Sequence, residues 1–325
     1  MIIVTGGAGF IGSAIVWKLN QLGKEKIIIV DEFEKNEKYK NLIQLKYLDF
    51  IDKKEFLVKI DKGFLVKNPV KYIYHMGACS STTETDVSYL HINNYEYTRT
   101  LCINSVANGI RFIYASSAAT YGNGKKGYQD DERKLDKLFP LNAYGYSKYQ
   151  FDLWAWKNRF LDKIAGLKYF NVYGPNEYHK GDMLSVVNKA FNQIKETGKA
   201  RLFRSYSSDY GDGEQKRDFI YIKDAVEMTI FFHENKKVNG IFNVGTGTAN
   251  TFNSFIKPIF KALNLPEQIE YFEMPDYLKG KYQDYTEADI TKIRNAGYKS
   301  NITPIEDAVT DYVTNYLNTD NPYLH

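Results

Sequence analysis

Apolar residues in the first half of the chain follow two spacings. Short continuous runs rich in β-branched residues predict buried strands, at residues 2–4, 26–30, 70–75 and 111–115, with a weaker candidate at 45–48. Residues 12–22 and 93–107 have the pattern of helices. Asp52, with Glu55 three positions later, predicts the N-cap of another helix that reaches about Ile60. This alternation predicts right-handed βαβ units and a parallel sheet.

The second half of the chain is less regular. It predicts helices over 144–160 and 182–197, the latter ended by Gly198, and strands over 167–170, 219–222 and 241–244. The stretch 205–215 is polar and contains glycine, which is typical of a loop. No internal repeat is present, and we expect the chain to cross between two lobes more than once.

Composition narrows the class of protein. The 325 residues carry 43 Lys and Arg against 39 Asp and Glu, a net charge of +4, which argues against nucleic-acid or membrane partners. No apolar run approaches the roughly 20 residues that span a bilayer, and we expect no secretory signal. Two cysteines and five histidines without metal-binding spacing exclude a disulfide framework and a zinc site. We therefore expect a reduced, cytoplasmic protein without a metal.

The strongest local signal is the segment T-G-G-A-G-F-I-G at residues 5–12. Its glycines satisfy both G-x-G-x-x-G and G-x-x-G-x-x-G, through Gly6, Gly7, Gly9 and Gly12. The segment links a predicted strand to a predicted helix, where the backbone must turn sharply and present free N–H groups to a pyrophosphate. With Asp31 at the tip of the second strand, it predicts dinucleotide binding. The expected fold class is α/β, a Rossmann-type doubly wound parallel sheet with a smaller mixed α/β substrate-binding lobe.

The identity of the dinucleotide stays open at this point. An acid such as Asp31 takes the ribose hydroxyls of NAD and repels the 2′-phosphate of NADP. Several lysines follow, Lys38 and Lys53 among them. They could neutralise a 2′-phosphate, or form an ordinary solvated face.

Tyr144 and Lys148 fit the pattern Y-x-x-x-K, which puts both side chains on one face of a helix. A free tyrosine titrates near about 10, and an adjacent ammonium and a positive nicotinamide ring both favour the phenolate needed for a base. Tyr146 has no lysine four positions later. Ser116 and Ser117 end the fifth predicted strand, where ligands sit in a doubly wound sheet. Paired serines are also ordinary turn residues.

These motifs, in this order, resemble the extended short-chain dehydrogenases/reductases that act on nucleotide sugars. Four longer stretches are more specific, namely HMGACSSTTETD (75–86), YFNVYGPNEYHKGDM (169–183), KRDFIYIKD (216–224) and LKGKYQDYTEADI (278–290). They are similar to the ADP-glyceromanno-heptose 6-epimerases of lipopolysaccharide biosynthesis. The resemblance covers nearly the whole chain and implies an NADP-dependent isomerase of carbohydrate metabolism.

The resemblance also implies roles for individual residues. NADP is the implied cofactor, with NAD as the open alternative, at Gly6, Gly9, Phe10, Ile11, Gly12, Asp31, Glu32, Lys38, Lys53, Met76, Gly77, Ala78, Cys79, Ser80, Asn93, Lys148, Val172 and Lys180. The implied substrate positions are Ser117, Asn171, Asp182, Lys189, Phe203, Arg204, Ser205, Tyr206, Arg217 and Tyr282. The chain departs from the family pattern at Asp182, at Lys189 and over 203–206, which concerns sugar and base recognition rather than the chemistry.

Tyr144 and Lys180 are the implied acid/base residues, with Ser117 and Lys148 in the same catalytic set. Epimerisation inverts a carbon whose C–H bond is unactivated, so direct proton removal there is unreasonable. Transient oxidation at carbon six, followed by hydride return to the other face, avoids that step. The implied reaction converts ADP-D-glycero-D-manno-heptose to ADP-L-glycero-D-manno-heptose.

Two alternatives remain beside this hypothesis. Another nucleotide-sugar epimerase or a dehydratase of the same superfamily is the closer one, although dehydratases carry an Asp-Glu pair where this chain has Ala118 and Ala119. A non-catalytic dinucleotide sensor is the alternative of a different class, and the intact Tyr144, Lys148 and Ser117 argue against it.

The resemblance suggests a homo-oligomer, a pentamer. We expect residues 1–172 plus about 216–245 to form the NADP-binding domain. About 173–215 plus 246–325 would form the substrate-binding domain.

Overall fold

The computed structural model describes residues 1–33, 36–275 and 283–325. Seven strands form a central parallel sheet in the order β11-β6-β5-β4-β1-β2-β3. Their bounds are β1 (Ile2–Thr5), β2 (Ile27–Asp31), β3 (Asp49–Asp52), β4 (Tyr72–His75), β5 (Arg111–Ser117), β6 (Ala165–Tyr169) and β11 (Gly240–Val244). The order reverses between β1 and β4, which places a ligand crevice at the carboxyl ends of these strands. The predicted fold class is confirmed.

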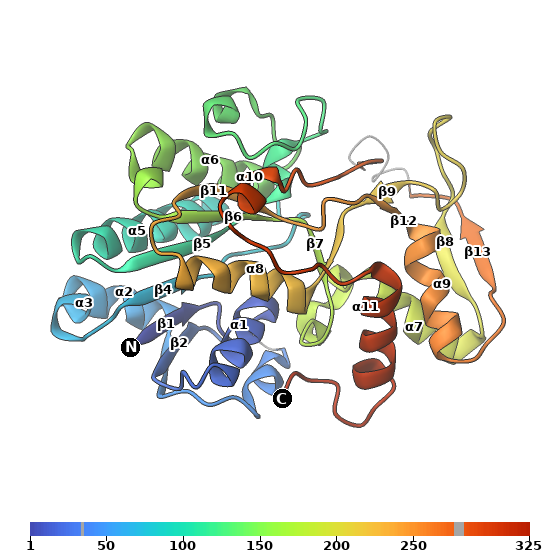
Figure 1. Ribbon diagram of the computed structural model, residues 1–325, viewed down its shortest axis with the longest axis horizontal. Helices are drawn as coiled ribbons and strands as arrows, with labels where there is room; N and C mark the ends of the chain where they lie inside the picture. Colours follow the sequence, from blue (N-terminus) through green and yellow to red (C-terminus); the bar gives the residue numbers. More distant parts are fainter. Residues whose placement is uncertain (34–35, 276–282) are drawn as a thin grey trace.

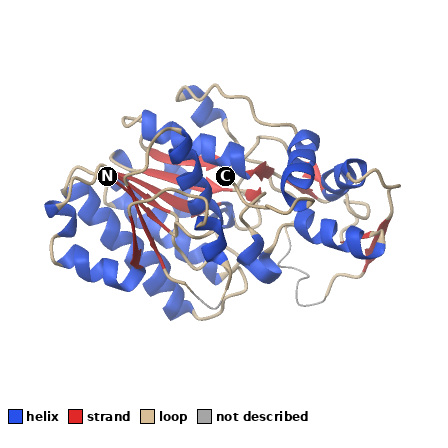
Figure 2. Ribbon diagram, turned by 90° about the horizontal axis from the view of Figure 1, so that it is seen from below, coloured by secondary structure: helices blue, strands red, loops and turns tan. Residues whose placement is uncertain are grey.

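Helices cover both faces of the sheet (Figure 1, Figure 2). Successive residues of β1 point to opposite faces, so that Ile2 and Val4 join one buried cluster and Ile3 joins the other. The first cluster is covered by α1 (Phe10–Gln21) and α8 (Ile222–Glu234). The second is covered by α2 (Lys53–Asp61), α5 (Tyr97–Ala107) and α6 (Ala143–Lys157). Shorter helices are α3 (Phe64–Lys67), α4 (Val87–Leu90) and α10 (Thr291–Asn295).

A smaller lobe lies at one end of the molecule, on the right in Figure 1. It contains α7 (Val186–Thr197), α9 (Phe252–Ala262), α11 (Ile305–Tyr312) and the parallel strands β8 (Ala200–Phe203) and β13 (Ile269–Phe272). Two short strand pairs lie between this lobe and the central sheet (Figure 1). They are β7 (Asn171–Tyr173) with β10 (Phe219–Tyr221), and β9 (Lys216–Arg217) with β12 (Asn250–Thr251).

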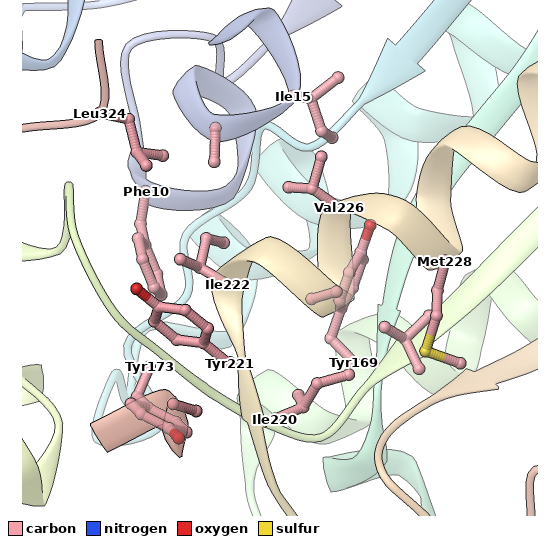
Figure 3. Close-up of a cluster of buried hydrophobic side chains, with 14 of the residues drawn as sticks. Phe10, Ile15, Tyr169, Tyr173, Ile220, Tyr221, Ile222, Val226, Met228 and Leu324 are labelled. Carbon is pink, nitrogen blue, oxygen red and sulfur yellow. The ribbon is translucent and has the colours of Figure 1, made fainter. Parts of the chain in front are cut away.

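Buried aromatic residues join the two lobes (Figure 3). Phe10, Tyr173, Tyr221 and Leu324 belong to one buried cluster contributed by segments far apart in the sequence. The ring of Tyr173 meets that of Phe255 edge-on, with centroids 4.7 Å apart. Because burying a large apolar side chain contributes roughly 1.5–3 kcal/mol, this cluster holds the start of α1 against β7 and β10.

Local signals near the ends of elements account for two of the confirmed bounds. The Asp52 carboxylate accepts hydrogen bonds from the N–H groups of Lys54 and Glu55, as predicted for the cap of α2. Gly198 ends α7 in the left-handed region, with φ of +76°. There a residue with a side chain is disfavoured.

Other predicted bounds are wrong. The third strand lies at Asp49–Asp52 rather than 45–48, because Leu42 and Leu45 turn into the core ahead of it. The strand predicted at 219–222 is confirmed as β10, Phe219–Tyr221, but it pairs with β7 outside the seven-stranded sheet. The helix predicted from residue 182 begins at Val186, because Leu184 and Ser185 have extended backbones, with ψ of +147° and +156°, and the Ser185 hydroxyl caps α7.

The helix predicted over 93–107 has a different beginning. Helical structure starts at α4 and continues through a π-helical stretch, His91–Glu96, into α5. Such π-helical segments inside α-helices are frequent at functional sites.

Candidate active site

A large cavity bounded by the described residues opens at the carboxyl ends of β1, β4 and β5 and extends to the smaller lobe. Its volume is about 1110 Å³. Sites for drug-sized molecules enclose roughly 300–1,000 Å³. The cavity therefore has room for more than one such ligand, or for a long one.

The glycine loop forms one wall of this cavity, and its geometry requires glycine at two positions. Gly6 has φ of +66°, and a Cβ there would lie 2.5 Å from the Gly77 nitrogen. A Cβ on Gly12 would lie 2.0 Å from the Gly6 carbonyl oxygen. The turn is therefore closed to side chains and leads directly into the N-terminus of α1, which fits a bound pyrophosphate.

The tip of β2 carries the acid predicted to meet the ribose. Asp31 is buried, and its carboxylate accepts from the Ala8 N–H at 2.9 Å and from the Lys38 ammonium at 3.0 Å. The neighbouring Glu32 forms an ion pair with Lys53, whose ammonium also donates to Asn93 at 3.0 Å. Both acids at this wall of the cavity are thus accompanied by a lysine.

Tyr144 and Ser117 meet at the opposite side of the crevice. Tyr144 lies in the first turn of α6, which Asn142 caps by accepting from the Gly145 N–H at 2.7 Å. Burial raises the pKa of the Tyr144 phenol, and a hydrogen bond with Ser117 opposes that rise. Burial is therefore the largest influence on this pKa in the chain alone, and the lowering expected beside a bound nicotinamide ring stays a prediction.

Lys148 lies one turn further along α6, as the Y-x-x-x-K spacing predicts. Its ammonium donates to the carbonyl oxygen of Ala115, at the end of β5, over 2.8 Å. Burial lowers the pKa of Lys148 to about 8, against the opposing influences of Asp152 and Cys79. The ammonium is therefore tied to the strand end and is easier to deprotonate than an ordinary lysine.

His75, at the end of β4, links Thr5 of β1 to Thr98 of α5 beneath the cavity, which the sequence did not predict. The Gly77 N–H donates to the Thr5 hydroxyl at 3.3 Å, which in turn donates to His75 Nδ1 at 2.6 Å. On the other side Thr98 donates to the Asn94 carbonyl at 2.5 Å and accepts from His75 Nε2 at 2.7 Å. Because the Thr98 hydroxyl donates its one proton to Asn94, His75 Nε2 carries a proton, and a neutral ring then accepts at Nδ1. Burial agrees, because it lowers the pKa of His75 to about 3.

Asn94, in the π-helical stretch, is a second residue that the sequence analysis missed. Its side chain accepts from the Cys79 N–H at 2.8 Å and donates to the Cys79 carbonyl at 3.0 Å. It also donates to the Ser147 hydroxyl at 3.0 Å. The loop after β4 is thereby fastened to the helix that carries Tyr144.

Lys180 enters the same cavity from the short 3-10 helix Tyr178–Met183. Its ammonium lies 5.0 Å from the centre of the Phe10 ring and 3.7 Å from a carboxylate oxygen of the buried Glu177. Burial lowers the pKa of Lys180, Glu177 opposes that change, and Lys189 adds to it.

The structure brings most of the predicted cofactor and substrate positions to this one cavity. All of the predicted catalytic and cofactor residues line it, together with Asn171, Lys189, Phe203 and Arg217 of the predicted substrate set. Asp182, Arg204, Ser205 and Tyr206 do not line it. Tyr282 lies outside the described residues.

The smaller lobe adds cavity residues that the sequence analysis did not single out. The Arg201 guanidinium lies 4.5 Å from the centre of the Phe272 ring, and Phe203 and Phe272 have ring centroids 4.9 Å apart. The strands β8 and β13 carry these residues side by side, a pairing that neither strand's sequence predicts alone. Aromatic and guanidinium planes of this kind suit a flat, conjugated group.

Two further findings concern the described part of the chain. Within it, no three His, Cys, Asp or Glu side chains gather in a group that could hold a metal ion. None of the helices in the described ranges is both long and apolar enough to cross a membrane.

A doubly wound parallel sheet, a closed glycine turn and a tyrosine–serine pair at the crevice define a class of enzymes that bind a nicotinamide dinucleotide. The family model described as the NAD dependent epimerase/dehydratase family matches residues 2–245. The chain therefore belongs to this family, and a nicotinamide dinucleotide is its class of cofactor.

Individual relatives are more specific. The ADP-L-glycero-D-manno-heptose-6-epimerase of Nitratidesulfovibrio vulgaris (strain DP4) is 52% identical over 324 residues, covering 100% of both chains. The protein of the same name from Fusobacterium nucleatum subsp. nucleatum is 48% identical over 336 residues, again covering 100% of both. The crystal structure of the Helicobacter pylori ADP-L-glycero-D-manno-heptose-6-epimerase superposes with a TM-score of 0.81 at 28% identity, covering 97% of this chain and 95% of that one. The resemblance noted in the sequence is confirmed.

Proposed function

We propose that this protein converts ADP-D-glycero-D-manno-heptose to ADP-L-glycero-D-manno-heptose at carbon six, with bound NADP. The observation that carries the proposal is that two acid/base groups from different elements, Tyr144 of α6 and Lys180 of the loop after β7, line one cavity with the glycine turn. Full-length similarity to heptose 6-epimerases supports the substrate.

The two groups have separate tasks in this reaction. A bound nicotinamide supplies the chemistry of taking a hydride from carbon six and returning it. Tyr144 and Lys180 move the hydroxyl proton, one for each configuration of the alcohol. Ser117 hydrogen-bonds the Tyr144 phenol and supports its proton transfer.

The preference for NADP over NAD rests on the lysines at the ribose wall. Lys38 pairs with Asp31 and Lys53 pairs with Glu32, so the carboxylates repel an added phosphate less than free acids would. We infer that these two ammonium groups meet the 2′-phosphate. Lys53→Met should weaken NADP more than NAD, by about 10–100-fold, because a hydrogen bond to a charged group contributes roughly 1.5–3 kcal/mol.

The domain division follows from the same assignment. Residues 1–172 plus about 216–245 would bind the cofactor, and about 173–215 plus 246–325 would bind the substrate. The homo-oligomer, its pentameric form and the cytoplasmic location stay predictions.

The deciding experiment follows the stereochemistry at carbon six by NMR with ADP-heptose as substrate, after acid release has identified the bound dinucleotide. Tyr144→Phe and Lys180→Met should each lower kcat by about 10²–10⁴-fold and retain the dinucleotide. Tyr146→Phe is the matched control, since that exposed phenol lies on the same helix. Reaction of a UDP-hexose at carbon four, with ADP-heptose untouched, would instead establish the 4-epimerase alternative. Dinucleotide binding without turnover of either substrate would favour the sensor.

A further inference from the structure

We propose that Glu177 is a positioning residue for Lys180, and that its carboxylate holds the Lys180 ammonium at the wall of the cavity. This inference rests on the proposed role of Lys180. Nothing in the sequence analysis singled out Glu177, whose side chain does not line the cavity.

The Glu177 carboxylate is fully buried and accepts three hydrogen bonds. One oxygen accepts from the Ser185 hydroxyl at 2.6 Å and from the Tyr312 hydroxyl at 3.0 Å. The other accepts from the Ser185 N–H at 2.8 Å and lies 3.7 Å from the Lys180 ammonium. These donors come from the start of α7 and from α11, so both elements fix the direction in which the negative charge points.

Neutral donors alone do not balance a buried carboxylate. Ser185 and Tyr312 satisfy its hydrogen bonds but leave its full negative charge, and an unpaired buried charge is costly. Lys180 is the cation that compensates it, with about a quarter of its side chain exposed toward the cavity. The pair therefore joins a fully enclosed anion to a cation that a substrate can reach.

The backbone does not need this ion pair to form the loop. The Lys180 N–H already donates to the Glu177 carbonyl at 3.0 Å, and the Ser185 side chain caps α7 by accepting from the Asn188 N–H at 3.2 Å. The carboxylate thus acts on the side chain of Lys180 beyond what the loop requires.

The surroundings of Lys180, apart from Glu177, favour its neutral form. Burial lowers the pKa of Lys180, and the ammonium of Lys189 on α7 lowers it further, whereas Glu177 raises it. The neighbouring His179 is neutral near pH 7, because burial lowers its pKa to about 4. From α1 the ammonium meets the Phe10 ring, which does not titrate. Glu177 is therefore the negative charge that keeps Lys180 protonated for returning a proton to the substrate oxygen.

Glu177→Gln tests this role, because it keeps the size and an acceptor for Ser185 but removes the charge. We expect kcat at neutral pH to fall about 10–100-fold, with KM changed less than about threefold. We also expect the high-pH limb of the kcat profile to move to lower pH by about one unit, the lower end of what an opposite charge within 4–6 Å contributes. Titration of the Lys180 side chain by NMR after ¹³C reductive methylation, assigned with Lys180→Arg, should show the same displacement without reliance on turnover.

Matched variants separate positioning from packing. Tyr312→Phe removes one neutral donor from the same carboxylate, and it should leave the high-pH limb in place. Glu177→Asp keeps the charge and should keep the limb, with a smaller loss of kcat. It also serves if Glu177→Gln does not fold.

Two results overturn the inference. One is a Glu177→Gln enzyme whose high-pH limb of the kcat profile does not move. The same conclusion holds if Tyr312→Phe and Glu177→Gln lower kcat equally and neither moves that limb. The other is a Glu177→Asp enzyme whose limb moves as far as that expected for the glutamine variant. Failure of the proposed function is a separate outcome, visible as a wild-type protein that does not epimerise ADP-heptose or a Lys180→Met protein that turns over normally.

Discussion

The ion pair between Asp152 of α6 and Lys168 of β6 provides a direct test of how the active-site floor is held together. Its charged atoms are 2.7 Å apart, and the two side chains are 0% and 1% exposed. The carboxylate also accepts from Tyr114 at 2.9 Å and from Ser116 at 2.7 Å, and the ammonium donates to Thr120 at 2.5 Å. Asp152→Asn would leave the Lys168 charge buried without its counterion.

The size of the effect follows from this burial. Removing one partner of a buried pair costs about 3–5 kcal/mol, because the remaining charge is uncompensated. An unfolding entropy of about 2.1 cal/mol/K per residue over 325 residues amounts to about 0.7 kcal/mol/K. The unfolding midpoint should therefore fall by about 4–7 °C. Asp152→Asn combined with Lys168→Met should lose less than the sum of the single losses, by at least about 2 kcal/mol.

Urea denaturation and calorimetry of the two single variants and the double variant measure these losses. Glu270→Gln is the matched control, since its pair with Lys199 spans 2.6 Å but both side chains are about half exposed, and it should leave the midpoint in place. Strict additivity of the two single losses would refute the reasoning, as would an Asp152→Asn loss no larger than that of the exposed control.

Two other perturbations address the crevice. Gly12→Ala would set a Cβ 2.0 Å from the Gly6 carbonyl oxygen, so it should abolish dinucleotide binding, measured as dinucleotide released per chain; Gly211→Ala, with only an ordinary contact at 3.5 Å, should retain it. Burial lowers the pKa of His75 to about 3. Below about pH 6.5 the unfolded chain therefore binds a proton at His75 that the folded chain does not bind. This group therefore leaves stability unchanged above pH 6.5 and lowers it as the pH falls toward 3. Urea midpoints across that range, with a flatter slope for His75→Gln, check this prediction.

Periodicity predicted the sheet well because parallel strands buried on both faces read as continuous apolar runs. Periodicity predicted a strand wrongly where apolar residues are buried from a turn rather than from a strand. Leu42 and Leu45 are buried from a turn beneath α1, and their burial resembles a strand although pairing with β2 begins at Asp49. The smaller lobe was harder to predict, since paired residues of β8 and β13 are 69 positions apart in the sequence and neither strand's sequence shows its partner.

The groups proposed to react were more predictable from the sequence than the groups that hold them in place. Tyr144 and Lys148 stand in a motif with a fixed spacing, and the structure places both at the crevice. Glu177, His75 and Asn94 act through hydrogen bonds to segments remote in sequence, so no local pattern distinguishes them from ordinary polar residues. For His75 there was a usable signal, because a polar residue that ends a buried strand in a doubly wound sheet lies at the crevice.

The spacing of four residues on α6 extends one step beyond the Y-x-x-x-K motif. Tyr144, Lys148 and Asp152 follow one another at intervals of four, which keeps all three on one helix face. Tyr144 meets the cavity, Lys148 meets the Ala115 carbonyl at the strand end, and Asp152 pairs with Lys168 in the core. One helix face therefore carries the phenol hydroxyl of the proposed site, an ammonium and a carboxylate at increasing depth. The carboxylate, which also raises the pKa of Lys148 against burial, anchors the same strand end that presents Ser117. In this chain the i+4 spacing that joins Tyr144 to Lys148 therefore also placed the buried carboxylate of Asp152 on the same helix face.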